Sequence, residues 1–205
     1  MTTPTFRYSV LMAALLALVV SCGGTKLYRT YVDETFKGQS VSNILVIGIV
    51  SKDRNRRQLE QRFVEKFQNL GVKAIASADA IPMPSDLKLE KTTILDTVQK
   101  FGNDAVIITH VVGISENETI VRNQNVEDNF YTYYGTRYNS VSAPGYARST
   151  TNVRLETSLY EVKSEHLIWS TVSETWNRDS ARQVIDEVVT LVVNDLHKRK
   201  LIASP

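Results

Sequence analysis

The chain has 205 residues, of which 42% are hydrophobic and 22% charged, and its formal net charge is +2. This composition supports a folded core and excludes a wholly disordered chain. The near balance of charge gives no indication of nucleic acid binding, which needs a strongly basic surface. After removal of a short leader, the length is that of one domain.

The start of the chain combines a single positive charge with a short apolar run and a cysteine. Arg7 is the only charged side chain before an unbroken apolar run from Val10 to Val20. That run of about 11 residues suits the core of a cleaved signal, whereas a membrane-spanning helix needs roughly 20. Val19-Val20-Ser21-Cys22 follows and resembles the lipobox that the lipoprotein signal peptidase cuts. We therefore expect residues 1–21 to be a signal peptide.

Cys22, the only cysteine of the chain, is the predicted lipidation site. Its thiol would receive a diacylglyceryl group, and acyl chains such as palmitate would then anchor the protein far more firmly than a single myristoyl chain. Gly23 follows where the sorting rules of model bacteria look for a retention Asp. The resemblance thus implies the periplasmic face of the outer membrane. A transmembrane anchor, or a secretory signal with a chance cysteine, is the alternative.

Residues 22–42 are polar and rich in turn-forming residues, and we expect them to form a lipidated tether. Tyr28, Tyr31 and Phe36 indicate that part of this tether packs against the domain. The folded domain is expected at 43–201.

Apolar periodicity predicts that this domain belongs to the α/β class. Buried strands are indicated by continuous apolar runs and helices by apolar residues at helical spacing. Gly71 and Gly102 follow two of these helices, where a left-handed residue is favoured. The predicted elements are strands at 43–50, 72–77 and 104–112, a hairpin at 153–176, and helices at 53–70, 89–101 and 180–200. The order β-α-β-α-β-β-β-α predicts a mixed sheet that starts with parallel strands.

Several segments resemble a family of uncharacterised bacterial lipoproteins. They are the lipobox, Asn55-Arg56-Arg57 with Glu60, Val72-Lys73-Ala74, and Leu167-Ile168-Trp169-Ser170 before a final helix. The element order is also similar to the amino-terminal domain of the Tol–Pal periplasmic propeller protein, a module shared with lipoproteins of curli secretion and Pel polysaccharide export. This resemblance implies a fold more than an activity.

Basic side chains crowd the start of the first predicted helix, namely Lys52, Arg54, Arg56 and Arg57. Cations at a helix N-terminus oppose the helix dipole, and ligands of open α/β sheets bind near the carboxyl ends of strands. One hypothesis is that Arg54, Arg56 and Arg57 bind an anion, such as a lipid phosphate or an acidic glycan. The alternative is a solvated helix face on which Arg56 or Arg57 pairs with Glu60.

The connection at 115–148 is much longer than an ordinary loop and is rich in tyrosine. Tyrosine offers a flat apolar face and a hydroxyl, which suits contacts with proteins or sugars. A hairpin whose aromatic rings pack on their own domain is the alternative. The candidate partner-binding residues are Phe130, Tyr131, Tyr133, Tyr134 and Tyr138.

No motif for catalysis or for phosphate binding is present. His110, His166 and His197 are dispersed, and His110 lies in an apolar strand, where a hydrogen-bonded core histidine is more common than a metal ligand. We therefore expect neither an enzyme nor a bound metal or cofactor.

The leading hypothesis is a non-catalytic outer-membrane lipoprotein that acts as an adaptor or assembly factor for another component of the cell envelope. One alternative is a ring-forming structural subunit of a polysaccharide or protein export apparatus. A second is a binder of peptidoglycan or anionic glycan.

Overall fold

The computed structural model describes residues 24–82, 88–113, 130–135, 152–176, 178 and 180–203. The predicted signal peptide, Cys22 and Tyr138 lie outside these residues. The elements in chain order are β1 (Thr25–Val32), the 3-10 helix η1 (Glu34–Phe36), β2 (Asn43–Ile49), α2 (Asp53–Gln68), β3 (Lys73–Ala76), α3 (Ser77–Ala80), α4 (Lys91–Phe101), β4 (Ala105–Val111), a short helix at 130–135, β5 (Asn152–Glu161), β6 (Leu167–Trp176) and α6 (Ala181–Lys198).

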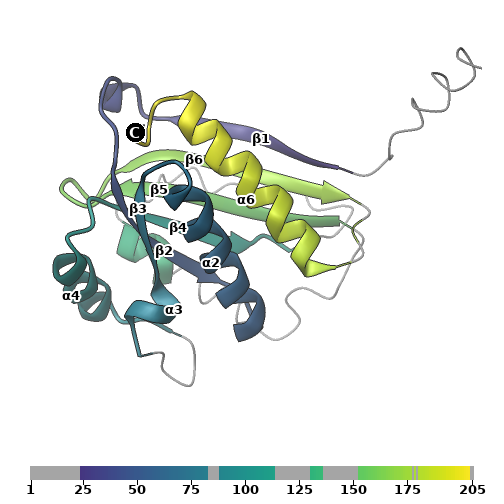
Figure 1. Ribbon diagram of the computed structural model, residues 1–205, viewed down its shortest axis with the longest axis horizontal. Coiled ribbons are helices and arrows are strands. Elements are labelled where there is room, and N and C mark those ends of the chain that lie inside the picture. Colours follow the sequence, from purple (N-terminus) through teal and green to yellow (C-terminus); the bar gives the residue numbers. More distant parts are fainter. Residues whose placement is uncertain are drawn as a thin grey trace, which may run out of the picture.

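The described strands form one six-stranded sheet in the order β1-β6-β5-β4-β2-β3 (Figure 1). Strand β2 runs parallel to β3 and β4, whereas β4, β5, β6 and β1 pair with one another in antiparallel fashion. The predicted α/β class and mixed sheet are confirmed, and from β2 onward the strands follow the predicted order.

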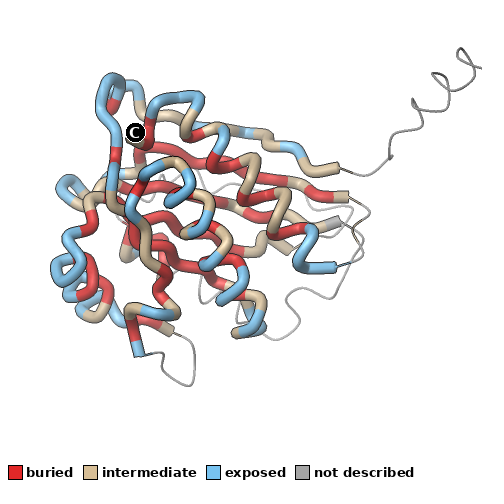
Figure 2. Tube along the Cα trace, in the orientation of Figure 1, coloured by how far each residue is buried: buried red, intermediate tan, exposed pale blue. Residues whose placement is uncertain are grey.

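Helices cover both faces of the sheet, and each face has its own apolar core. Side chains of α2 and α6 pack on one face, with Phe63, Val188 and Trp169 all fully buried. On the other face, Ile94 of α4 and the aromatic rings of helix 130–135 pack on β2 and β4. Figure 2 shows the result, in which the central strands are almost wholly buried. This burial on both faces explains the continuous apolar runs of β2 and β4.

The N-terminal boundary of the domain differs from the prediction. Thr25–Val32 is an edge strand in which Thr25 lies opposite Thr175 of β6, and Leu27 and Val32 pack against the core. Val41 is also buried and forms an isolated parallel bridge with Ile202. The domain therefore begins at Thr25, and the segment expected to be a tether belongs largely to the fold.

Strand β1 contains a β-bulge-like irregularity, which is typical of exposed sheet edges. Its register with β6 shifts between Tyr28 and Tyr31, and Arg29 within this irregularity has a φ of +53°. Such bulges twist an edge strand and disturb the row of free backbone groups with which a further strand could pair.

In the part of the chain that the structure describes, no helix is long and apolar enough to cross a membrane.

The role of β1 in stability can be tested by truncation. We expect a version that begins at Asp33 to unfold at a lower urea concentration than one that begins at Gly23, because it loses the contacts of Leu27 and Val32. The loss should be at least about 2 kcal/mol in the free energy of unfolding. Equal urea midpoints for the two versions would show that β1 is dispensable.

Candidate functional site

Helix α2 lies directly on strand β2, and Gly48 permits this close approach. A Cβ at Gly48 would meet the Cγ of Arg56 and the Cδ2 of Leu59 at 3.3 Å, and the Cγ of Glu60 at 3.5 Å. The two contacts at 3.3 Å are tighter than ordinary van der Waals packing, so the side chains of Arg56 and Leu59 would have to shift by a few tenths of an ångström to admit a Cβ. This explains why an apolar strand carries a glycine at that position.

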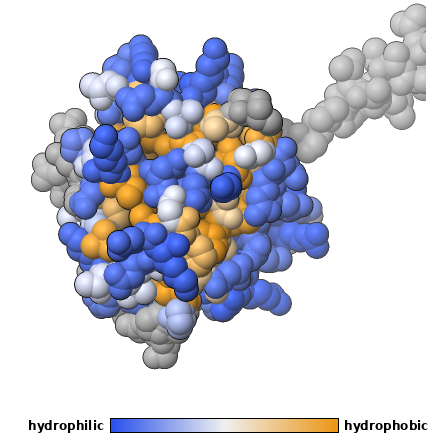
Figure 3. Space-filling view, turned by 60° about the vertical axis from the view of Figure 1, so that its left-hand side comes forward, coloured by the Kyte–Doolittle hydropathy of each residue, from blue (hydrophilic) through white to orange (hydrophobic). Residues whose placement is uncertain are grey.

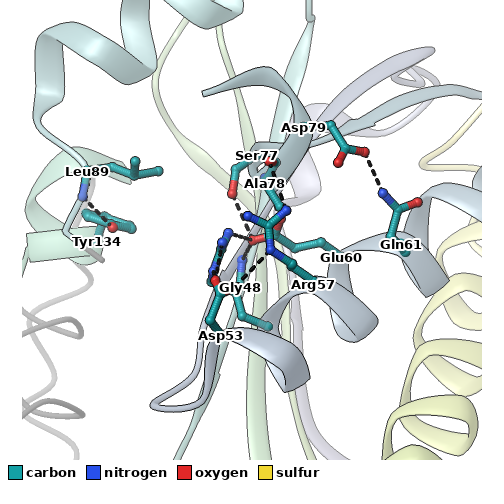
Figure 4. Close-up of polar contacts among 11 residues, drawn as sticks. Gly48, Asp53, Arg57, Glu60, Gln61, Ser77, Ala78, Asp79, Leu89 and Tyr134 are labelled. Atoms are coloured by element: carbon teal, nitrogen blue, oxygen red, sulfur yellow. Dashed lines mark hydrogen bonds and ion pairs between the residues drawn. The ribbon is translucent and has the colours of Figure 1, made fainter. Parts of the chain in front are cut away.

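Glu60 is fully buried and joins three elements (Figure 4). Its Oε1 accepts hydrogen bonds from the backbone N of Gly48 at 2.9 Å and from the Oγ of Ser77 at 2.8 Å. Its Oε2 accepts from the backbone N of Ala78 at 2.8 Å. The Nη1 of Arg56 lies 3.2 Å from Oε1 and supplies the compensating positive charge. One carboxylate thus holds α2 against both β2 and the start of α3.

Asp53 pairs with Arg56 and Arg57 in the first turns of α2. Arg56 donates to its Oδ1 from Nη2 at 2.6 Å and from Nε at 3.1 Å. Arg57 donates from Nε to Oδ2 at 2.9 Å, and its Nη1 reaches the carbonyl of Ala78 at 3.3 Å. Hydrogen bonds first from Arg56 and then from Arg57 hold the pKa of Asp53 below its ordinary value.

The pKa of Glu60 is displaced in the opposite direction. Burial raises it above the ordinary value, because a charged carboxylate is poorly solvated between the helix and the sheet. The backbone N–H groups of Gly48 and Ala78, the hydroxyl of Ser77 and the charge of Arg56 oppose this effect without cancelling it.

The three arginines predicted to bind an anion do not converge on a common ligand position. The side chain of Arg56 is 1% exposed and is shared between Asp53 and Glu60. Arg57 is half-exposed and is paired with Asp53. Arg54 is exposed, and no carboxylate among the described residues pairs with it. The geometry agrees with the alternative hypothesis, in which arginines at the start of the helix pair with acidic side chains of the same helix. The cluster is therefore a structural junction.

The described part of the tyrosine-rich connection packs on its own domain, which is the alternative that the sequence left open. Phe130, Tyr133 and Tyr134 are each no more than 4% exposed. The rings of Phe130 and Tyr133 lie with their centroids 6.2 and 5.5 Å from that of Tyr160 on β5. Tyr131 is only partly buried, and the Nζ of Lys91 lies over its ring, 4.4 Å from the ring centroid. In this fold the buried rings offer no surface to a partner.

Hydrogen bonds hold these tyrosines in place. The hydroxyl of Tyr134 accepts from the backbone N of Leu89 at 2.8 Å, across 45 residues of sequence (Figure 4). The hydroxyl of Tyr133 lies 3.1 Å from Nδ1 of His110 and accepts from Oγ of Ser158 at 3.2 Å. His110 is thus a buried, hydrogen-bonded core histidine, as its apolar strand predicted. Burial raises the pKa of Tyr131 above its ordinary value.

The described residues contain no group of three or more His, Cys, Asp or Glu side chains that could hold a metal ion.

Several solved structures are similar to this chain. No family model matches it, and neither does any curated protein. PelC from Paraburkholderia phytofirmans, crystallised as a dodecamer, shares 10% identity, covers 88% of this chain and 99% of PelC, and gives a TM-score of 0.47. A point variant of PelC gives 9% identity, 88% and 100% coverage and a TM-score of 0.45.

A protein from Xanthomonas campestris assigned to the family model DUF330 shares 10% identity, covers 82% of this chain and 94% of its own, and gives a TM-score of 0.35. At these scores the similarity does not assign the chain to a family.

Replacement of Glu60 tests the junction beneath α2. We expect Glu60→Gln to lower the free energy of unfolding by about 1–3 kcal/mol, because the amide NH2 would face groups that donate hydrogen bonds. Urea unfolding measures this loss. Glu65→Gln, on the exposed side of the same helix, is the matched control and should have little effect.

The pH dependence of the free energy of unfolding tests the same variant more sharply. Because the folded pKa of Glu60 is raised, its contribution to stability is fully present below its ordinary pKa of 4.5 and is lost as the pH rises through the folded value. The difference in unfolding free energy between the wild type and Glu60→Gln should therefore narrow as the pH rises. A difference that stays constant with pH would contradict a raised pKa.

Proposed function

We propose that this chain is a non-catalytic lipoprotein of the outer membrane that faces the periplasm and serves as an adaptor or assembly factor for another envelope component. The lipid on Cys22 holds the protein at the membrane. The α/β domain provides the surface that the partner contacts, and no reaction is involved.

The observation that carries this proposal is the position of β1 relative to Cys22. The strand begins at Thr25, and the carbonyl of Gly24 already accepts a hydrogen bond from the backbone N of Trp176 at 3.0 Å. The three residues from Cys22 to Thr25 span at most about 11 Å when fully extended. An acylated Cys22 would therefore hold the folded domain directly at the lipid surface.

A partner needs accessible apolar contacts, and the described residues offer some on α4 and β1. Leu95 and Phe101 of α4 are 38% and 36% exposed, and Tyr31 of β1 is 42% exposed. Figure 3 brings forward the side on which α4 lies in Figure 1, and it shows apolar residues exposed between hydrophilic ones. Exposed apolar and aromatic side chains of this kind are enriched in protein interfaces.

A second candidate function is that of a self-assembling structural subunit, and the open edge of β1 favours it. That edge pairs with no other strand among the described residues. A second copy could add its own strand there, although the bulge at Arg29 restricts the length of such pairing.

Lipidation is tested first. We expect the full-length protein to incorporate labelled palmitate and to fractionate with outer membranes, and Cys22→Ser to lose both properties because no other thiol is present. Ser21→Ala keeps a small residue before the cysteine and should behave as the wild type. Membrane association and labelling that survive in Cys22→Ser would contradict the anchor.

Photo-crosslinking in living cells tests the partner. With the probe at Leu95, Phe101 or Tyr31, we expect a discrete adduct that mass spectrometry identifies as an envelope component. A probe at the buried Tyr134 is the matched control and should give none. An adduct of the protein with itself, with a large oligomer in light scattering, would favour the structural subunit. No adduct at any exposed position, despite normal expression, would contradict the adaptor.

A further inference from the structure

Strand register brings distant parts of the chain to one end of the sheet. Strand β1 starts where β6 ends, since Thr25 lies opposite Thr175. Strand β6 ends where β5 starts, and β5 starts where β4 and β2 end. Helix α6 also starts here, because Thr25 donates from Oγ1 to Oε2 of Glu187 at 2.7 Å. We call this the anchor end, because it lies next to Cys22 in the sequence.

The anchor end carries an excess of exposed positive charge. Lys26 of β1, Lys52 and Arg54 after β2, and Arg182 in the first turn of α6 are all exposed. Within the described residues, no carboxylate pairs with any of these four side chains.

Asp53, Glu174 and Glu187 at this end are instead engaged with other cations. Asp53 is held by the arginines of α2. Glu174 pairs with Arg154 at 2.8 Å. Glu187 pairs with Arg178 at 2.6 Å. The carboxylates are therefore neutralised locally, and the four exposed cations are left to face an external anion.

An aromatic ring lies among these cations. The Nζ of Lys26 lies over the ring of Trp176 at 4.6 Å from its centroid, and Trp176 is partly exposed at the last position of β6. Tryptophan and lysine next to each other are typical of surfaces at the level of lipid headgroups, where the indole ring is amphipathic.

From these observations we infer that the anchor end is a docking surface for the anionic phospholipid bilayer that holds Cys22. This inference rests on the proposed lipid anchor, because the link of three residues keeps this end within reach of the headgroups. Lipid phosphates pair with Lys26, Lys52, Arg54 and Arg182, while Trp176 lies at the headgroup level. Each cation near an anionic membrane strengthens binding about fivefold.

The sole cysteine allows this surface to be tested without the cellular lipidation machinery. The thiol of the mature chain, residues 22–205, is coupled to a maleimide lipid in vesicles of phosphatidylcholine with or without phosphatidylglycerol. Brominated phospholipid then quenches the fluorescence of any tryptophan that it contacts. Trp169 is fully buried, and Trp176→Phe gives the signal of Trp169 alone for subtraction.

We expect quenching of Trp176 in vesicles that contain phosphatidylglycerol and much less in pure phosphatidylcholine. Substituting Lys26, Lys52, Arg54 and Arg182 together by Gln should weaken docking about fivefold for each charge removed. The matched control replaces four exposed lysines at the opposite end of the domain by Gln, and docking should be unchanged. These control positions are Lys73, Lys163, Lys198 and Lys200.

Absence of Trp176 quenching, or an equal loss of docking in both variants, would overturn the docking surface. Because the maleimide bond replaces the natural lipid, this result is independent of whether cells acylate Cys22. Failure of palmitate labelling in cells would instead contradict lipidation of Cys22. The two experiments therefore distinguish failure of the docking surface from failure of the proposed lipoprotein function.

Discussion

Pairing of β1 with β6 is the constraint on which the rest of this structure depends. It adds an edge strand to the sheet from residues that lie 150 positions away in sequence, and it gives partners to buried hydroxyls of β6. Thr175 meets Thr25 at 2.8 Å and Thr171 meets Thr30 at 2.9 Å. Buried hydroxyls without hydrogen-bond partners would cost free energy. Strand β1 therefore covers β6 and also supplies hydrogen-bond partners for its buried hydroxyls. The same pairing fixes where the folded domain begins relative to the predicted lipid.

The charged side chains around α2 separate into an internal and an external group. Internally, Asp53 and Glu60 balance Arg56 and Arg57, and this junction sets the position of α2 on β2. Leaving a buried group without its hydrogen-bonding partner costs about 1–3 kcal/mol, whereas exposed pairs contribute about 0–1 kcal/mol. The internal group is therefore structural. Arg54 lies outside this group and pairs with no carboxylate among the described residues, so its charge faces the surroundings at the anchor end of the sheet.

Most of the fold could be predicted from the sequence, because its signals are local. Helix α6 was expected at 180–200 and spans Ala181–Lys198, since its apolar stripe repeats at helical spacing. Strand β1 was missed because its alternation is weak and its partner is distant. The spacing of Arg56 and Glu60 indicated their pairing, but nothing in the sequence places Ser77 beside them. Likewise, the sequence shows that this connection is rich in tyrosine, but it does not show that the hydroxyl of Tyr134 accepts a hydrogen bond from the backbone N of Leu89.

We propose that the domain rests on the membrane with almost no tether. Neutron reflectometry on a supported bilayer that carries the lipidated protein measures this directly, as the thickness of the hydrated layer between headgroups and protein. We expect a layer no thicker than about 11 Å, the reach of three extended residues. A tether of the length first expected, residues 22–42, would instead give an average separation of about 25 Å if flexible. A hydrated layer of that thickness would show that the domain does not rest on the membrane.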